Sequence, residues 1–349
     1  GAVEDLFGHN IATDGSSIIV GAPGEGNGAA YIYSKSGGNW TEQAQLTLDA
    51  GEIISNEIYA ISSDIDGGVA VLGSGSSFAI NCNSTGSAYV YEFDGSDWLK
   101  TARLTADDGQ PFDNFGTDVK VHGNTIAVGA EGICMSAATQ GYAYVFEKVD
   151  GTWAQTAKLT APDGVVGDGF GRNLCLYDDK IVVGVYRHNS QTGAAYFYEK
   201  VDGIWTFREK IVPNDFATGD AFGYEVSIWE NRLLAASNSN SNVYTNTGAA
   251  YIFEYNGSNW VERQKILPLE GGEDYRFGRY NDLSASSAIL KVQGGATHIL
   301  KFHNVETIYD TIPIYDSIPV NDTIPIYDTI AVYDSIAVTD TLIIDAVLT

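Results

Sequence analysis

A segment that begins with tryptophan and ends with leucine or isoleucine recurs five times along the chain. The five segments start at Trp40, Trp98, Trp153, Trp205 and Trp260, with spacings of 58, 55, 52 and 55 residues. Self-similarity at a period of this size indicates a repeat architecture, in which each unit packs on its neighbours. The chain is therefore expected to fold as an array of equivalent units.

Two further marks recur in register with the tryptophans. A Phe-Gly pair begins at Phe7, Phe115, Phe170, Phe222 and Phe277, and the unit near Tyr59 lacks it. A Gly-Ala-x-Tyr motif, or a close variant, ends at Tyr31, Tyr89, Tyr144, Tyr196 and Tyr251. Together these marks define six units, of which the last has no Trp-led segment.

Each unit is predicted to contain four strands. In the first unit these are residues 10–13, 17–21, 29–33 and 40–46, joined by Asp-Gly and Gly-Gly turns that tolerate positive φ. The inner strands are continuously apolar, as strands buried on both faces are, and the Trp-led strands alternate. Four strands per repeated unit are typical of a β-propeller. The sequence thus predicts an all-β fold, with a propeller over residues 1–306.

The motifs resemble a known repeat. Gly21-Ala22-Pro23 after Phe7-Gly8 resembles the FG-GAP repeat, the blade unit of the integrin α-subunit propeller. The Leu-Thr-Ala-x-Asp-Gly linkers at residues 104–109 and 159–164, the second followed by Asp-x-Phe-Gly, resemble a bacterial surface-protein version. The resemblance covers roughly residues 4–306. Because the family often has seven blades, seven stays open beside the six that we count.

The charge of the chain excludes several partners. Its 349 residues include 19 Lys and Arg against 45 Asp and Glu, a net charge of −26. Nucleic acid and anionic lipid surfaces need basic patches, so neither is an expected partner. No run of 18 apolar residues occurs, so no membrane insertion is expected. The start at Gly1-Ala2-Val3, without Met, is interpreted as a mature exported chain at a bacterial cell surface.

Candidate sites for an ion are few. The integrin resemblance implies a calcium loop of the form Asp-x-Asp-x-Asp-Gly, and its nearest match is Asp64 and Asp66 before Gly67. Calcium needs six or more oxygen ligands, so the segment is either a Ca²⁺ site or a structural turn. Three aspartates that each lie two residues before Phe-Gly are interpreted as structural bonds between blades, because an active site is not repeated in every blade. They are Asp113, Asp168 and Asp220.

The three cysteines have separate predicted roles. Cys82 and Cys134 lie in corresponding loops of neighbouring units, so an inter-blade disulfide is expected in an exported protein. Cys175 alternates with leucines on a predicted inner strand and is expected to be a buried free thiol. The five histidines are scattered, and no nucleophile elbow, Walker motif or dinucleotide fingerprint occurs. An enzyme is not expected.

From Tyr309 the sequence becomes a six-residue repeat of the type Tyr-Asp-Thr-Ile-Pro-Ile, present six times. It contains no Gly, so residues 307–349 are predicted to form an extended β tail. Asp followed by Ser or Thr and an apolar residue resembles an O-glycosylation sequon of exported bacterial proteins, although a polar repeat can also produce it. The candidate O-glycan acceptors are Thr311, Ser317, Thr323, Thr329, Ser335 and Thr341.

The sixth unit lacks its outer strand, which leaves a sheet edge open to strand addition. The added strand is expected to be either residues 305–312 of the same chain or the tail of another copy. The chain is therefore predicted to be a structural subunit of a bacterial cell-surface filament that binds copies of itself through the tail. The alternative is an adhesin or lectin-type propeller that binds a glycan or a surface protein.

Overall fold

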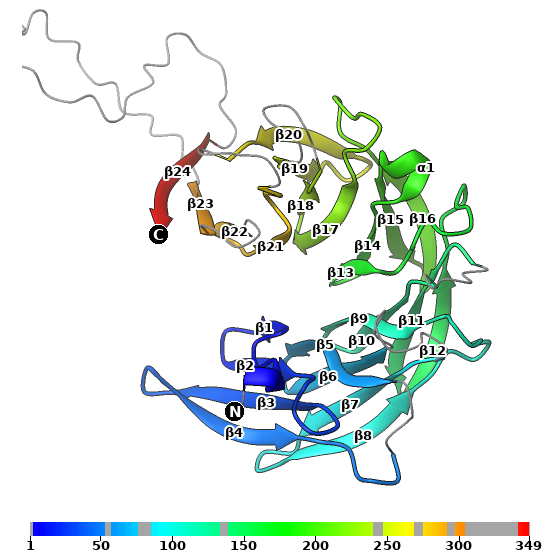
Figure 1. The fold of residues 1–349 in the computed structure, drawn as a ribbon, viewed down its shortest axis with the longest axis vertical. Coiled ribbons are helices and arrows are strands. Elements are labelled where there is room, and N and C mark those ends of the chain that lie inside the picture. The colour runs from blue at the N-terminus through cyan, green and yellow to red at the C-terminus, as the bar shows by residue number, and fades with distance from the viewer. Residues whose placement is uncertain are drawn as a thin grey trace, which may run out of the picture.

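The computed structural model describes residues 3–52, 57–75, 85–132, 139–239, 247–268, 275–291, 297–303 and 341–348. Its strands form six four-stranded antiparallel sheets, the blades, which follow one another around an arc (Figure 1). The all-β propeller predicted from the sequence is confirmed, with six blades in the described part of the chain.

The blades follow the chain in order. Blades 1 to 3 contain β1 (Ile11–Thr13), β2 (Ser17–Ala22), β3 (Ala29–Ser36), β4 (Asn39–Leu46), β5 (Ile58–Asp66), β6 (Val69–Gly75), β7 (Ser87–Phe93), β8 (Trp98–Leu104), β9 (Phe115–His122), β10 (Thr125–Ala130), β11 (Tyr142–Val149) and β12 (Thr152–Leu159). Blades 4 to 6 contain β13 (Asn173–Tyr177), β14 (Lys180–Val185), β15 (Ala194–Val201), β16 (Ile204–Ile211), β17 (Phe222–Trp229), β18 (Arg232–Ser237), β19 (Ala249–Tyr255), β20 (Trp260–Ile266), β21 (Tyr280–Leu283), β22 (Ser287–Lys291), β23 (Thr297–His303) and β24 (Thr341–Leu348). The described helices are two short turns, η1 (Val3–Asp5) and α1 (His188–Gln191).

Each blade is a meander whose strand order equals the chain order. The Trp-led strands β4, β8, β12, β16 and β20 are the last and outermost strands of their sheets, as predicted. The second and third strands are the most buried because neighbouring blades cover both of their faces; β10, for example, is buried from Ile126 to Ala130.

The Phe-Gly and Gly-Ala-x-Tyr motifs meet between neighbouring blades. Parallel bridges join Gly86 to Phe115, Gly141 to Phe170, Gly193 to Phe222 and Gly248 to Phe277. At Gly86 φ is +84°, and a Cβ there would overlap the backbone of Phe115. Glycine is required because the two backbones are in direct contact. Between blades 1 and 2 Tyr59 takes the place of the phenylalanine beside Gly28, and it is 1% exposed.

A second contact repeats between the innermost strands. A polar side chain on the first strand of one blade accepts a hydrogen bond from a backbone N–H on the first strand of the next. The pairs are Asp64 with Val121 at 2.8 Å, Asp118 with Leu174 at 2.8 Å and Asn173 with Val226 at 2.7 Å. Neighbouring blades are thus held together at the axis as well as at the Phe-Gly contact.

Among the described residues, blades 1 and 6 at the two ends of the arc each leave one face exposed. Phe7 of blade 1 is 55% exposed, whereas the phenylalanines of the other four Phe-Gly pairs are at most 1% exposed. On the opposite side of the arc Ile289 of blade 6 is 43% exposed, while Leu234, in the same position of blade 5, is fully buried. No strand pairing among the described residues joins blades 1 and 6, which Figure 1 shows apart.

The fourth strand of blade 6 comes from the end of the chain. β24 pairs antiparallel with β23 from Thr297 opposite Leu348 to His303 opposite Thr341. The sequence predicted that this edge would accept a strand, but the strand is not residues 305–312, which lie outside the described residues. Residues 304–340 separate the two paired strands.

Candidate functional site

Three linkers between blades place an aspartate on the next blade. Each carboxylate accepts a hydrogen bond from the tyrosine of the Gly-Ala-x-Tyr motif and forms an ion pair with a lysine on the outer strand. The clusters are Asp108 with Tyr144 and Lys158, Asp163 with Tyr196 and Lys210, and Asp215 with Tyr251 and Lys265. Because the same cluster occurs on blades 3, 4 and 5, its primary role is to fix each linker to the following blade.

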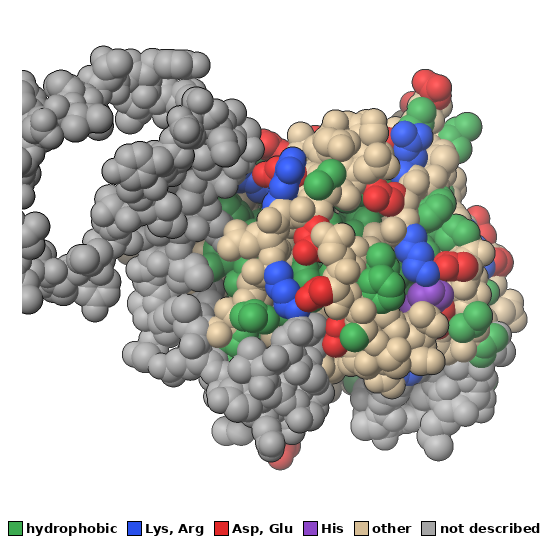
Figure 2. All heavy atoms as spheres, turned by 90° about the horizontal axis from the view of Figure 1, so that it is seen from above, with side chains coloured by type: hydrophobic (Ala, Val, Ile, Leu, Met, Phe, Trp, Pro, Cys, Tyr) green, Lys and Arg blue, Asp and Glu red, His purple; other side chains and the backbone are tan. Residues whose placement is uncertain are grey.

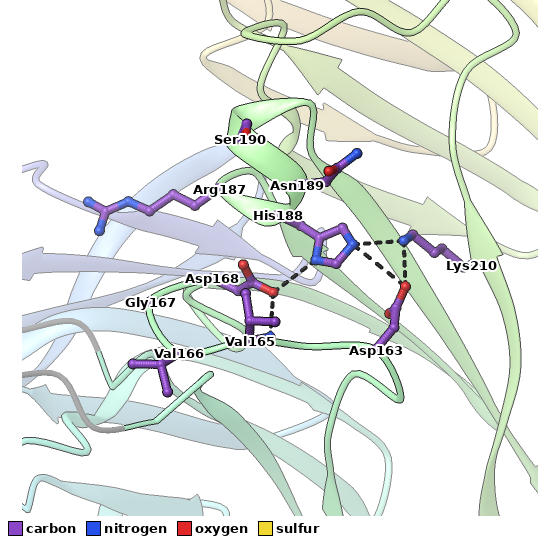
Figure 3. Close-up of a pocket in the computed structure, with 10 residues that line it drawn as sticks. All are labelled: Asp163, Val165, Val166, Gly167, Asp168, Arg187, His188, Asn189, Ser190 and Lys210. Carbon is purple, nitrogen blue, oxygen red and sulfur yellow. Dashed lines mark hydrogen bonds and ion pairs between the residues drawn. The ribbon is translucent and has the colours of Figure 1, made fainter.

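Blade 4 differs from blades 3 and 5 because a histidine joins this cluster. His188 Nδ1 lies 2.8 Å from Asp168 Oδ2, and its Nε2 lies 2.8 Å from Lys210 Nζ (Figure 3). Asp163 Oδ2 is 2.7 Å from the same ammonium group and 3.6 Å from His188 Nε2. The histidine therefore bridges the Asp163 cluster to Asp168, the aspartate before the Phe170-Gly171 pair.

The contacts of His188 determine its tautomer. An ammonium group only donates hydrogen bonds, so Nε2 must accept from Lys210 and carry no proton. The proton lies on Nδ1 and is donated to Asp168. Lys210 thus occupies Nε2 of His188, and the pair holds the Lys210 side chain in place.

The electrostatics of Asp163 follow from its partners. Burial opposes ionisation, but the hydrogen bonds from Lys210 and Tyr196 outweigh it and hold the pKa of the Asp163 carboxyl below its usual range. Burial, together with the hydrogen bond to Asp163, raises the pKa of the Tyr196 phenol well above its usual value. Asp163 is therefore a carboxylate and Tyr196 a neutral donor at physiological pH.

The loop that carries His188 has an unusual backbone. In α1 Asn189 has φ 49° and ψ 62°, Ser190 has φ 59° and ψ 41°, and Gln191 has φ 63°. Three consecutive non-glycine residues in the left-handed region are rare, and each costs about 1–2 kcal/mol. His188 is 7% exposed and anchors this turn, so Asn189 and Ser190 extend from a fixed base (Figure 3).

The cluster lines a cavity of about 710 Å³ on blade 4. Figure 3 shows His188 between Asp168 on one side and Lys210 and Asp163 on the other. The lining residues are Asp163, Val165, Val166, Gly167, Asp168, Arg187, His188, Asn189, Ser190 and Lys210. Lys210 donates to Asp163 Oδ2 and to His188 Nε2, so hydrogen bonds link the polar groups of this cavity.

The sequence predicted only part of this site. It marked Asp113, Asp168 and Asp220 as structural contacts between blades, whereas the hydrogen bonds found lie within each linker. Asp113, Asp168 and Asp220 each accept a hydrogen bond from the backbone N–H three residues earlier, on Gln110, Val165 and Ala217 respectively. These bonds close the linker loop and do not cross between blades, and Asp168 also contacts His188. Asp163 lies in a recurring linker motif, but no sequence signal pointed to His188 or Lys210.

The proposed ion ligands Asp64 and Asp66 both bind the backbone of blade 3. Asp64 Oδ2 accepts from Val121 N at 2.8 Å, and Asp66 Oδ2 accepts from Gly123 N at 2.7 Å. Burial raises the pKa of Asp64 to about 6. No group of three or more potential metal-ligating side chains occurs among the residues that the structure describes. This geometry fits a structural turn, and a Ca²⁺ site stays a prediction.

The cysteine predictions have different outcomes. Cys175 is 4% exposed on β13, and burial raises the pKa of its thiol. The predicted buried free thiol is confirmed. The predicted disulfide between Cys82 and Cys134 lies outside the described residues. So do the candidate O-glycan acceptors Thr311, Ser317, Thr323, Thr329 and Ser335, whereas Thr341 is the first residue of β24.

A second charged cluster lies on the innermost strands. Lys120 Nζ is 2.9 Å from Asp118 Oδ1 on β9. Burial alone would lower the pKa of Lys120, but the carboxylates of Asp118 and Asp64 raise it. Burial raises the pKa of Glu225 on β17 to about 8, and the charge of Asp118 contributes to the same shift. The Glu225 carboxyl therefore keeps its proton to a higher pH than an exposed glutamate does.

This shift predicts a pH-dependent stability. A carboxyl whose pKa is higher in the folded protein than in the unfolded chain stabilises the fold at low pH, and this stabilisation is lost as the pH rises through the folded value. We expect Glu225→Gln to have a higher melting temperature than the native protein at pH 9, by a margin that narrows toward pH 5. Thermal unfolding of both proteins between pH 5 and pH 9 measures the difference in melting temperature. A difference that does not change with pH would contradict the raised pKa of Glu225.

The outer surface has a mixed character. On the face drawn in Figure 2 acidic and basic side chains are interspersed, and apolar side chains lie between them. This mixture is consistent with the many surface ion pairs, such as Lys148 with Glu92 at 2.5 Å. In the part of the chain that is described, no helix has the length and apolar character needed to cross a membrane.

The chain was compared with a family profile, with curated protein sequences and with solved structures. The sequence profile of the FG-GAP repeat matches residues 1–33, 98–146, 153–198 and 205–253, just over half of the chain. No curated protein sequence matches significantly. Among solved structures, hydrazine synthase of Kuenenia stuttgartiensis is similar with a TM-score of 0.54 and 13% identity, over 86% of this chain and 79% of that one. YjhT is similar with a TM-score of 0.44 and 12% identity, over 85% and 94%. The likeness to hydrazine synthase concerns the fold alone.

Proposed function

Since the chain belongs to the FG-GAP repeat family, we propose that it is an exported structural subunit of a bacterial cell-surface filament. In this proposal the propeller is the repeating body, and the end of the chain connects one subunit to the next by strand addition. FG-GAP repeats are typical of extracellular proteins. The observation that carries the proposal is the pairing of β24 with β23.

The position of β24 makes exchange between copies feasible. The strand lies at the outer edge of blade 6, where β23 is its one partner among the described strands. Residues 304–340 connect it to β23, and 37 residues reach at most about 120 Å when fully extended. A strand on such a long connection can add to the same edge of a neighbouring copy with the same register, which is the usual route to domain swapping.

The experiment removes the strand and keeps the propeller. We expect deletion of residues 341–349 to abolish high-order assemblies in electron micrographs and in sedimentation velocity, with the tryptophan fluorescence of the other blades unchanged. The matched control deletes one hexad, residues 327–332, which shortens the connection and leaves β24 in place; it should still assemble. Identical assemblies from the chain without 341–349, or a full-length chain that is monomeric at every concentration, would show that the strand does not connect subunits.

An adhesin or lectin-type propeller is the second candidate function. The observation that favours it is the cavity on blade 4, because His188 distinguishes that blade from the two blades with the same aspartate cluster. The two functions are compatible, since the cavity and the edge strand lie on different blades.

A further inference from the structure

We propose that the cavity on blade 4 binds a neutral sugar residue, with Lys210 and Asp163 as the groups that bind its hydroxyls. The proposal gives the second candidate function a specific site and does not depend on strand addition, so either can fail without the other. It rests on four features of the cavity: free hydrogen-bonding capacity, balanced charge, an exposed apolar rim and a fixed loop.

The first feature is the hydrogen-bonding capacity around Lys210. An ammonium group has three N–H donors. One is directed at Asp163 Oδ2 at 2.7 Å and a second at His188 Nε2 at 2.8 Å, which leaves a third. Asp163 retains acceptor capacity beside it, since its side chain is 53% exposed and each carboxylate oxygen accepts two hydrogen bonds. A sugar hydroxyl both accepts and donates, so it can accept from Lys210 and donate to Asp163 at the same time.

The second feature is the balance of charge. The cavity contains two carboxylates, Asp163 and Asp168, and two cations, Lys210 and Arg187. His188 is neutral in the tautomer that its partners determine. A charged ligand would gain little electrostatic attraction from these two carboxylates and two cations, and it would lose its hydration on binding. The net charge of −26 further disfavours an anionic ligand.

The third and fourth features concern the rim. Val165 and Val166, between the two aspartates in sequence, are 59% and 63% exposed and line the same cavity. Adjacent exposed aliphatic side chains offer an apolar surface to the C–H face of a pyranose ring. On the other side the left-handed turn carries Asn189 and Ser190 (Figure 3), whose amide and hydroxyl groups can bind further hydroxyls. Because the turn is anchored by His188, little ordering is needed on binding.

The comparison between blades provides the control. Lys265 forms the same cluster with Asp215 and Tyr251 on blade 5, without a histidine. Removing Lys265 therefore measures what loss of the aspartate–tyrosine–lysine cluster does to the fold, while removing Lys210 also removes its contact with His188. An effect on sugar binding should be confined to Lys210.

The test is a ligand-observed NMR titration of the full chain with the methyl glycosides of glucose, galactose, mannose and N-acetylglucosamine, and with glucuronate as the charged comparison. We expect at least one neutral glycoside to bind in the millimolar range. Lys210→Met should weaken its binding roughly tenfold or more, because it removes a charged hydrogen bond. Lys265→Met should leave binding unchanged.

A second variant keeps the test decisive if Lys210→Met is poorly folded. Val166→Ser changes an exposed side chain and should not affect folding, yet it should weaken binding severalfold through loss of the apolar rim. The proposal is overturned if no neutral glycoside binds, if glucuronate binds more tightly than the neutral sugars, or if the Lys210 and Lys265 variants weaken binding equally. Unchanged binding in both Lys210→Met and Val166→Ser would also overturn it.

Discussion

Replacing Phe222 by alanine should lower the free energy of unfolding by about 3–5 kcal/mol, because the side chain fills the space between blades 4 and 5. Phe222 is fully buried, and its ring lies 5.6 Å from that of Tyr251 and 5.9 Å from that of Phe253. The cavity left by the ring cannot be filled by backbone movement, since the same residue is bridged to Gly193. Guanidinium denaturation followed by tryptophan fluorescence measures the loss.

The chain contains its own control for this prediction. Phe7 belongs to the same Phe-Gly motif but is 55% exposed, with Tyr31 as its ring neighbour. We expect Phe7→Ala to cost less than about 1 kcal/mol, as substitutions at exposed positions generally do. Equal losses for the two variants would mean that the motif stabilises each blade internally and not the contact between blades.

Gly86→Ala should be destabilising for a different reason, which is direct overlap between two backbones. Its φ is +84°, and a Cβ would overlap the carbonyl oxygen of Phe115, which cannot move without separating blades 2 and 3. Gly151 has a similar φ of +82°, but nothing lies within 4 Å of the position that a methyl group would take there. Gly151→Ala therefore measures the cost of the left-handed backbone alone, about 1–2 kcal/mol.

We expect Gly86→Ala to lose several kcal/mol more than Gly151→Ala in the same denaturation experiment, or to fail to accumulate as folded protein. Circular dichroism shows whether Gly86→Ala is folded but less stable or does not fold at all. If both variants lost the same amount, backbone conformation and not the contact with blade 3 would explain why glycine occurs in this motif.

The fold could be predicted because its determinants are local and repeated. Trp98 and Trp153 mark outer strands, and Gly86 and Phe115 mark the contact between blades. Once these positions are assigned in one unit, the same motifs locate the corresponding elements in the other units. The fourth strand of blade 6 was predicted only in part. The sequence indicates an incomplete sheet, but several apolar alternating segments could complete it, and the nearest of them is not the one that does.

The candidate site could not be predicted in the same way. His188 lies 20 residues from Asp168 and 22 from Lys210, so nothing local connects the three. They meet because the loop turns through a left-handed conformation at Asn189 and Ser190, which residue preferences do not favour for serine. A site that occurs once in a repeat array produces no recurring motif. A search for recurring motifs therefore finds the blades but not this site.

The exposed face of blade 1 at Phe7 has a consequence for local unfolding. In an array held together by contacts between neighbours, opening of a unit is opposed by the contacts on both of its sides. Among the described residues the main contacts of blade 1 with another blade are those with blade 2, whereas blades 3 and 4 have a neighbouring blade on both sides. Thermal opening of this protein is therefore expected to begin at an end blade and not at blade 3 or 4, and the blade carrying the cavity lies behind three others when unfolding enters at blade 1.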